Sequence, residues 1–354
     1  MVTPINRPSA AQRFFRGLGL GVVWTILGLV TVWAVAALYF DLSPARWPIV
    51  SPVLYLLALT VVAYLAKARL LRMAVFLIGF LAVLVCWLSL QPSNHRNWQE
   101  DDSQTPWAEV DGDRVTIHNF RNCDYRTETD YTCSWLTKTV DLSQLKGVDV
   151  FVTYWGSKWI AHPIVSFQFG ENDHVATSIE TRDQVGQGYS AIRGFFRQYE
   201  LLYVFADERD LVRLRTNYRK DEDVYLFRTT AGPHWSRLLF LQYIDQANKL
   251  HEHPKWYNAA TDNCTTNIFT QMAATGELPA GSSLHDWWIL LNGRGPEYLY
   301  RHGNFAGNLP FPELMQRAHI NAVAHTVNDD PDFSRRIRLN RPGFESLNSS
   351  NGTP

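Results

Sequence analysis

Residues 18–40 read LGLGVVWTILGLVTVWAVAALYF, a run of 23 residues without a charged side chain. A helix needs about 20 apolar residues to cross the hydrocarbon core of a bilayer, so this run is long enough. Two further uncharged runs of 18 residues each follow, at residues 49–66 and 73–90. A cleaved signal peptide is the alternative for the first run, but its apolar core would have only about 7–15 residues. The sequence therefore predicts a membrane anchor of three transmembrane helices within residues 1–92.

Charge divides the chain at the same place. The 354 residues include 33 Lys and Arg and 34 Asp and Glu, and the net charge of -1 excludes a strongly basic nucleic-acid-binding protein. Residues 1–92 contain seven of the basic residues and one acidic residue, Asp41. This leaves 26 basic and 33 acidic residues, a formal charge of -7, in residues 93–354. We therefore expect the two parts to lie in different surroundings.

Basic residues also predict the orientation of the anchor, because cytoplasmic loops are enriched in Lys and Arg. Three arginines precede the first run, and three basic residues lie between the second and third runs. The loop after the first run has only Arg46. With three spans, the N-terminus is cytoplasmic and everything after Gln91 lies outside. In a bacterium, this describes an inner-membrane protein with a periplasmic C-terminal domain.

The part after the anchor has the pattern of an α+β domain. Residues 93–110 are polar and predict a linker, residues 111–336 form the expected domain, and residues 337–354 are expected to be a flexible tail. Strands are predicted by alternating or apolar runs at 114–122, 133–141, 148–155, 162–169, 174–182, 201–206, 211–215 and 224–228. Helices are predicted by apolar spacing at 233–251 and 264–275.

The four cysteines fall into different settings. Cys123 and Cys133 lie on either side of a polar turn between two predicted strands, which in an oxidising compartment favours a disulfide across the hairpin. Two separate thiols are the alternative. Cys86 lies in the third apolar run and is expected to be a small apolar filler. Cys264 is then unpaired in a compartment where thiols usually pair, which indicates a functional role.

Cys264 lies in the segment YNAATDNCTTNIF, residues 257–269. Asp262 or Asn263 can cap a helix whose first turn contains the thiol. A helix N-terminus favours a thiolate, and the backbone N–H groups around Asn263 and Thr265 can form an oxyanion hole. Cys264 is therefore a candidate nucleophile, and its base must be a histidine from another part of the fold.

His162 is the best candidate for that base. It begins a predicted strand, and the proline that follows it keeps its backbone extended. His174, at the next turn, is the second candidate. If the strands on either side of this turn form a hairpin, Glu180, Thr181 or Arg182 lies opposite His162, and of these Glu180 can accept a hydrogen bond from the imidazole. The alternative role for Glu180 is a surface ion pair with Arg182. No Cys or His spacing suits a metal and no glycine-rich nucleotide motif occurs, so we expect neither metal nor cofactor.

Four segments resemble the Lnb N-terminal periplasmic domain family: AHPIVSF, SIETR, YELLYVFADERD and DNCTT. The resemblance extends over roughly residues 111–305. It implies a circularly permuted papain-like (NlpC-type) fold, in which the strand with the histidine precedes the helix with the cysteine. By this resemblance, Cys264 is the nucleophile and His162 is the base.

The family's namesake is a bacterial lipoprotein N-acyltransferase. It takes an acyl chain from a phospholipid as a thioester and transfers the chain to the amino group of a lipoprotein. This chain differs because its membrane helices precede the domain, which leaves the acceptor open.

Three functions are compatible with the sequence. The first is a membrane-anchored periplasmic acyltransferase that uses Cys264, with a phospholipid as donor, a lipoprotein or another amine as acceptor, and no nucleic acid as partner. The second is a thiol hydrolase or peptidase that acts on cell-envelope peptides, and the third is a non-catalytic envelope protein. The anchor favours the first, because it holds the site where acyl chains are concentrated.

Overall fold

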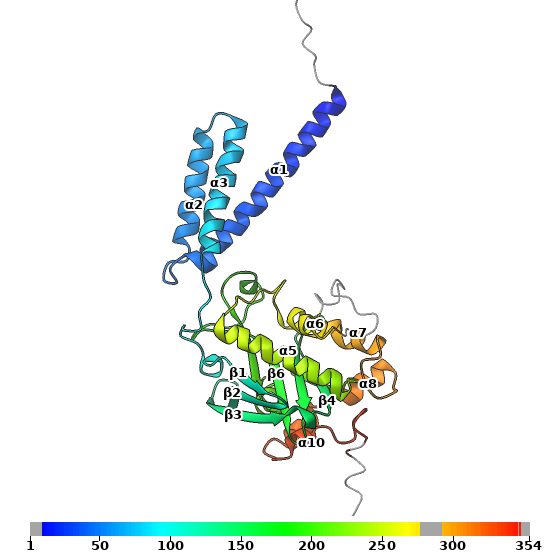
Figure 1. Cartoon of the computed structure of the whole chain (residues 1–354). Helices are drawn as coiled ribbons and strands as arrows, with labels where there is room; N and C mark the ends of the chain where they lie inside the picture. The colour runs from blue at the N-terminus through cyan, green and yellow to red at the C-terminus, as the bar shows by residue number, and fades with distance from the viewer. Residues whose placement is uncertain (1–8, 277–291, 346, 348–354) are drawn as a thin grey trace, which may run out of the picture. The chain divides into compact units, whose positions relative to one another are not determined.

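The computed structural model describes residues 9–276, 292–345 and 347. The chain forms two compact units (Figure 1). The first unit comprises Met1–Gln91 with Ile192–Gln198, and the second comprises Pro92–Ala191 with Tyr199–Pro354.

The first unit contains three apolar helices: α1 (Ala10–Ala37), which continues as a π-helical turn over Leu38–Leu42, α2 (Val50–Leu65) and α3 (Arg69–Leu88). Two helical segments are long and apolar enough to cross a membrane, Ala11–Leu42 and Arg69–Leu88. The third, α2, has only 16 residues, because Ala66 takes an extended backbone (ψ 111°) that ends the helix at Leu65. Within the described residues, the structure thus gives two candidate spans and a shorter apolar helix, instead of the three spans that we predicted.

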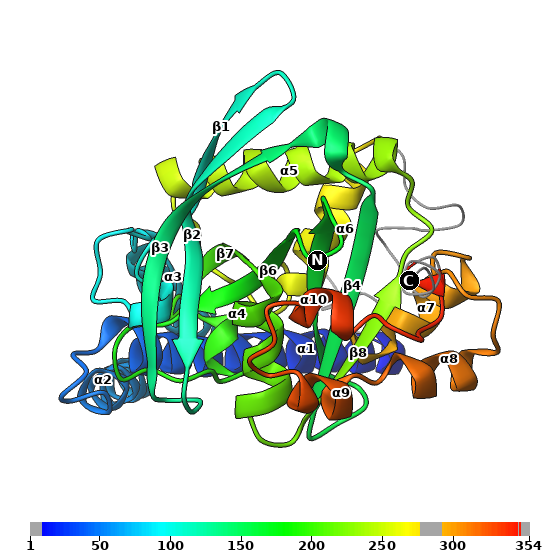
Figure 2. The ribbon, with the colours of Figure 1, turned by 90° about the horizontal axis from the view of Figure 1, so that it is seen from below.

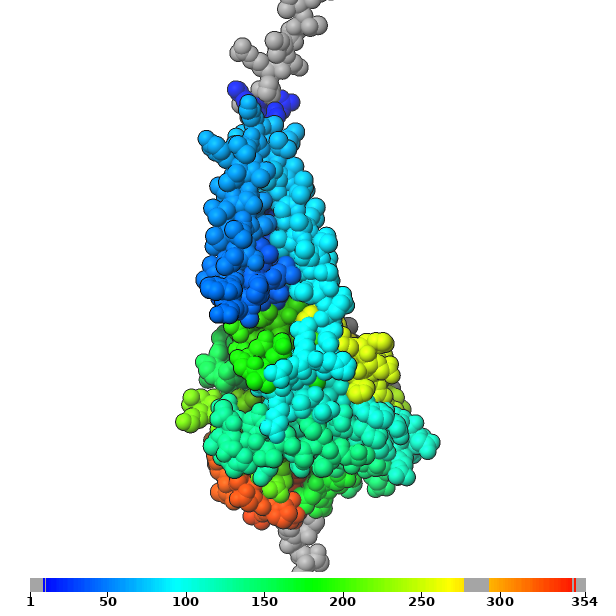
Figure 3. Space-filling model, turned by 90° about the vertical axis from the view of Figure 1, so that its left-hand side faces the viewer, coloured from blue at the N-terminus to red at the C-terminus, as the bar shows by residue number. Residues whose placement is uncertain are grey.

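Aromatic and polar contacts hold these helices together. The Trp33 ring of α1 packs edge-on against Phe80 and Trp87 of α3, with centroids 5.7 and 5.2 Å apart. At the end of the π-helical turn, Asp41 accepts hydrogen bonds from the Trp87 indole at 2.7 Å and the Gln198 amide at 2.7 Å. Figure 3 shows the side chains of α2 (blue) against those of α3 (light blue).

The second unit is built on a mixed eight-stranded sheet. Its strands follow the order β1-β2-β7-β6-β5-β4-β8, with β3 paired to β2 (Figure 2). Only β2 and β7 pair in parallel, and the other pairs are antiparallel. The strands are β1 (Trp107–Asp111), β2 (Arg114–Tyr125), β3 (Tyr131–Asp141), β4 (Gly147–Trp155), β5 (Ala161–Gln168), β6 (His174–Arg182), β7 (Glu200–Ala206) and β8 (Glu222–Arg228).

Helices cover both faces of the sheet. The helices are α4 (Glu208–Arg213), α5 (Pro233–Glu252), α6 (Cys264–Ala274), α7 (Gly295–Arg301), α8 (Phe311–Ala318), α9 (Asn321–Thr326) and α10 (Phe333–Arg336). Buried residues of α5 and α6 form one core with one face of the sheet, and α5 lies across the strands in Figure 1. Buried residues of α4, α9 and α10 form a second core with the opposite face. The structure therefore confirms an α+β domain, with a mixed sheet between two helical layers.

One predicted strand is wrong. Residues 211–215 lie in α4 and in the π-helical turn Leu214–Tyr218 that follows it. The helix forms because the Asp207 side chain caps it, accepting a hydrogen bond from the N–H of Asp210 at 2.9 Å. The charged residues from Asp207 to Asp210, which alternation alone assigns to a turn, are therefore the start of a helix.

The segments at both ends of this unit are packed into it. Arg182 of β6 donates to the Asp102 carbonyl at 2.8 Å and to the Asn94 side chain at 2.7 Å, so residues of the expected linker are fixed on the sheet. Arg338, in the expected tail, is fully buried and forms ion pairs with Asp149 at 2.8 Å and Glu208 at 2.6 Å. The folded unit therefore includes residues on both sides of the range 111–336.

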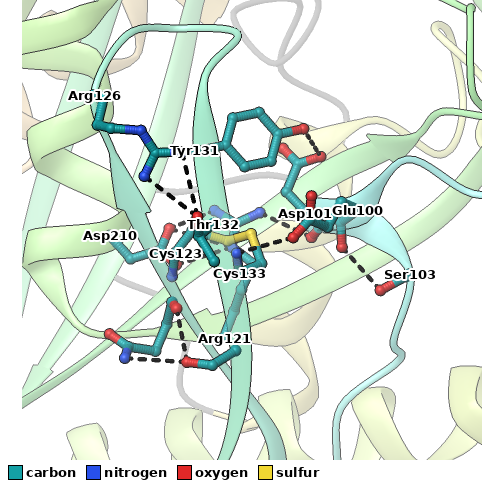
Figure 4. The surroundings of a disulfide bond; sticks show 12 residues. Glu100, Asp101, Ser103, Arg121, Cys123, Arg126, Tyr131, Thr132, Cys133 and Asp210 are labelled. Carbon is teal, nitrogen blue, oxygen red and sulfur yellow. Dashed lines mark hydrogen bonds and ion pairs between the residues drawn. A yellow bond between two sulfur atoms is a disulfide. The ribbon is translucent and has the colours of Figure 1, made fainter.

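The structure also confirms the disulfide between Cys123 and Cys133. The two residues face each other directly on β2 and β3, with Cα atoms 4.0 Å apart. Figure 4 shows charged side chains around this bond, of which Arg121 and Asp210 are buried. Asp210 of α4 accepts a hydrogen bond from the Cys123 N–H at 2.7 Å and forms an ion pair with Arg121 at 2.7 Å. The disulfide therefore joins β2 and β3 near their connecting turn, where Asp210 of α4 contacts β2.

Candidate active site

Cys264 is the first residue of α6, and its side chain is 8% exposed. The helix begins there because Asn263 and Thr266 form a capping box, with N–H-to-oxygen distances of 2.9 Å in both directions. The Asn263 amide also donates to the Ala259 carbonyl at 2.8 Å, so this side chain is already engaged as a cap. The N–H groups of Cys264 and Thr265 lie in the first turn, where the helix offers them no acceptor. They can donate to an oxyanion.

His162 is buried at the start of β5, and the Cys264 side chain lies near enough to raise the pKa of its imidazole. Its Nε2 lies 3.1 Å from a Glu180 carboxylate oxygen and 2.7 Å from the Ser178 hydroxyl. The register of the hairpin explains this contact. Ile164 pairs with Ser178, and because the strands are antiparallel, His162, two residues before Ile164, lies opposite Glu180, two residues after Ser178. The structure thus brings together the three residues that the sequence singled out.

Charge around His162 favours the imidazolium. Burial alone would lower the pKa of His162, but the Glu180 carboxylate and the nearby Cys264 side chain outweigh it and raise the pKa to about 8. Although burial opposes ionisation of Glu180, the charges of His162 and Arg215 hold the pKa of this carboxyl well below its usual range. The site therefore holds an ionised carboxylate and a mostly protonated histidine at neutral pH.

Two polar partners of Glu180 were not predicted from the sequence. The Ser178 hydroxyl donates to Glu180 at 2.5 Å, and the buried Arg215 guanidinium donates to the same carboxylate oxygen at 3.0 Å. Ser178 could have been found, because it lies two residues before Glu180 on the same face of one strand. No local signal marks Arg215, since the π-helical turn that carries it reaches the site only in the folded domain.

Two tyrosines complete the surroundings of the thiol. Tyr257 is buried, and the Tyr189 side chain lies close enough to affect the pKa of its phenol. Burial, with the nearby Cys264, raises the pKa of both phenols, so both hydroxyls stay protonated at neutral pH. They are further hydrogen-bond donors beside Cys264.

His174, the second candidate base, lies elsewhere. It pairs with Gln168 at the end of β5 opposite to His162, and neither of its ring nitrogens has a hydrogen-bond partner among the described residues. Burial, followed by the positive charge of Arg338, lowers the pKa of His174 to about 4. It is a neutral core residue in this fold.

Comparisons with known proteins give one result. The model of the Lnb N-terminal periplasmic domain matches residues 131–293, which is a narrower range than the sequence segments suggested. No curated protein and no solved structure is significantly similar to the chain. The matched range begins with β3 and includes His162, Glu180 and Cys264. Residues 131–293, with the whole candidate active site, belong to the Lnb N-terminal periplasmic domain family.

Proposed function

We propose that this protein is a membrane-anchored, cysteine-dependent acyltransferase of the bacterial cell envelope. Cys264 is the nucleophile, and His162 transfers the proton. Glu180 orients the imidazole and stabilises its protonated form. One observation carries the proposal: a buried thiol at a helix N-terminus lies near a buried histidine whose Nε2 is 3.1 Å from a carboxylate oxygen. Nucleophile, base and orienting group are then in the order that thiol enzymes require.

The reaction has two steps. The proton of the Cys264 thiol passes to His162 as the sulfur attacks the carbonyl carbon of a phospholipid ester, and the oxyanion accepts hydrogen bonds from the N–H groups of Cys264 and Thr265. The C–O bond breaks, the alcohol leaves with the proton from His162, and a thioester remains. In the second step, an amine attacks the thioester, its proton passes to His162, and the thiolate is released as the amide forms. The raised pKa of His162 suits it to give the first proton.

Permutation of a papain-like fold is part of this proposal. The strand β5, which carries His162, precedes the helix α6, which carries Cys264, and this order fits the permuted thiol enzymes. In this proposal α6 begins beside the start of β5, as a thiol–imidazole pair needs.

The apolar helices support a phospholipid as donor, because they keep the domain at a bilayer. The family match supports a periplasmic location. We propose that the N-terminus is cytoplasmic and the second unit periplasmic, at the inner membrane, with α2 as the middle crossing. The acceptor is an amine, of which the N-terminus of a lipoprotein is the first candidate.

The decisive experiment is to trap the acyl-enzyme. The full chain, in detergent or nanodiscs, is incubated with phospholipid labelled in its acyl chains, quenched with acid and analysed by peptide mass spectrometry. We expect a hydroxylamine-labile acyl mass on the peptide with Cys264, which is lost in Cys264→Ala and His162→Ala but retained in Cys86→Ala. The Cys86 variant is the matched control, since Cys86 is an exposed thiol on α3. A Cys264 peptide that stays unmodified while phospholipid is present would refute the proposal, and cleavage of envelope peptides would then be tested.

A further inference from the structure

The second unit contains an apolar cavity of about 400 Å³. It lies between the sheet and the helices α5, α6 and α7, and aliphatic side chains of β4, β5 and α5, such as Val150, Val165 and Leu239, form much of its wall. Its volume falls in the range of about 300–1,000 Å³ that is common for small-molecule sites.

The cavity begins next to the nucleophile. Thr265 lines it, and the Thr265 hydroxyl oxygen is 3.8 Å from the Cys264 sulfur. From there the wall follows one stripe of α6, through Ile268, Phe269 and Met272. These positions are three, four and seven residues after Thr265, which is the spacing of one helical face, and they extend about 10 Å along the axis.

The lining selects for an alkyl chain. Two of its hydroxyls are already engaged, because Thr229 donates to the Val148 carbonyl at 2.6 Å and Thr230 donates to the Gly303 carbonyl at 3.1 Å. Asn304 adds one amide nitrogen that has no acceptor among the described residues. A peptide or sugar would leave most of its polar groups unpaired here, whereas an alkyl chain has none to satisfy.

We propose that this cavity holds the alkyl chain of the acyl donor, with the ester carbonyl at Cys264 and the chain along α6. The inference rests on the proposed function for the identity of the donor, but the cavity can be tested without acyl transfer. Each methylene withdrawn from water into such a wall strengthens binding by about fourfold at most. Reagents that combine a thiol-reactive head with alkyl chains of increasing length should therefore react with Cys264 increasingly fast.

Alkyl methanethiosulfonates, from ethyl to decyl, are suitable probes. The thiolate attacks the alkyl-bearing sulfur, the mixed disulfide forms, and methanesulfinate leaves with the electron pair. Rates at Cys264 are measured by mass spectrometry in the full chain, in nanodiscs. The exposed thiol of Cys86 serves as internal control, because its dependence on chain length reports partition into lipid alone.

We expect the ratio of the Cys264 rate to the Cys86 rate to rise by at least about tenfold between ethyl and hexyl. Ile268→Trp, which fills the cavity, should remove this rise. Thr270→Trp, on an exposed position of the same helix, should keep it. If Ile268→Trp does not fold, Gly232→Leu replaces it, because Gly232 lines the cavity and a Cβ there meets no atom within 4 Å.

Equal chain-length dependence at the two cysteines, or in the filled and control variants, would overturn the inference. The two proposals fail separately. A chain-length effect at Cys264 without any acyl-enzyme would keep the cavity and reject acyl transfer. An acyl-enzyme without a chain-length effect would keep acyl transfer and reject the cavity.

Discussion

His162 lies between opposite charges, and each neighbour should move its pKa in a known direction. Glu180 raises the pKa of His162, whereas burial and Arg215 lower it, with a result of about 8. In Glu180→Gln, only the lowering effects and the thiol contact remain, so we expect the pKa to fall by about 1–3 units. In Arg215→Met, the pKa of His162 should rise, because a positive charge that lowers it is removed. Histidine-selective NMR titration of the full chain measures both shifts.

The comparison of the two variants is the control. A structural disturbance of the site would move the pKa of His162 in the same direction in both, which would contradict this electrostatic account. Loss of acyl-enzyme in Glu180→Gln with retention in Arg215→Lys would further identify Arg215 as a positioning residue.

Among the elements, the hairpin of β5 and β6 was the most predictable. Alternation and a polar turn located both strands, and pairing across the turn placed residues 180–182 opposite His162, while the exact register came from the structure. Cys264 was predictable because its helix cap is local in sequence. The position of Arg215 was not predictable, because the alternating residues around it favour a strand. The helix that forms instead is started by the Asp207 cap. Tertiary packing decided that segment.

The first turn of α6 depends on its cap. Asn263→Ala removes the acceptor of the Thr266 N–H, and we expect it to lower the free energy of unfolding by about 0.5–2 kcal/mol. Asn263→Asp keeps an acceptor and should retain most of the stability. Thermal unfolding of the full chain in detergent measures the difference. Equal destabilisation by the two variants would show that capping is not the cause.

The short helix α2 decides the orientation of the domain. Its 16 residues span about 24 Å, against a hydrocarbon core of about 30 Å. If α2 crosses, Ser43→Cys should react with a membrane-impermeant maleimide outside spheroplasts, and Ala68→Cys only after permeabilisation. The experiment uses a Cys86→Ala, Cys264→Ala background. Labelling of both positions from one side would show that α2 does not cross.

On the scale of the whole molecule, the Cys123–Cys133 disulfide is a covalent constraint on folding that the sequence predicted. It closes a loop between residues ten apart, so we expect its loss to lower the free energy of unfolding by about 2–3 kcal/mol. Urea unfolding of the full chain, with and without dithiothreitol, measures the effect. The Cys123→Ala, Cys133→Ala variant is the control, because the reductant should not change its stability. Identical unfolding of the native chain in both conditions would contradict this expectation.

Arg338 has a consequence for how the protein is made. It is the buried cation for Asp149, 189 residues earlier, and for Glu208, 130 residues earlier. Until it arrives, Glu208 lacks this cation and Asp149 pairs with Arg228 alone among the described residues, at 2.9 Å, so burying the two carboxylates is costly. During synthesis, the apolar helices can enter the bilayer first, while the sheet waits for a residue that emerges late. The second unit therefore cannot complete this charged part of its core until most of the chain has been made.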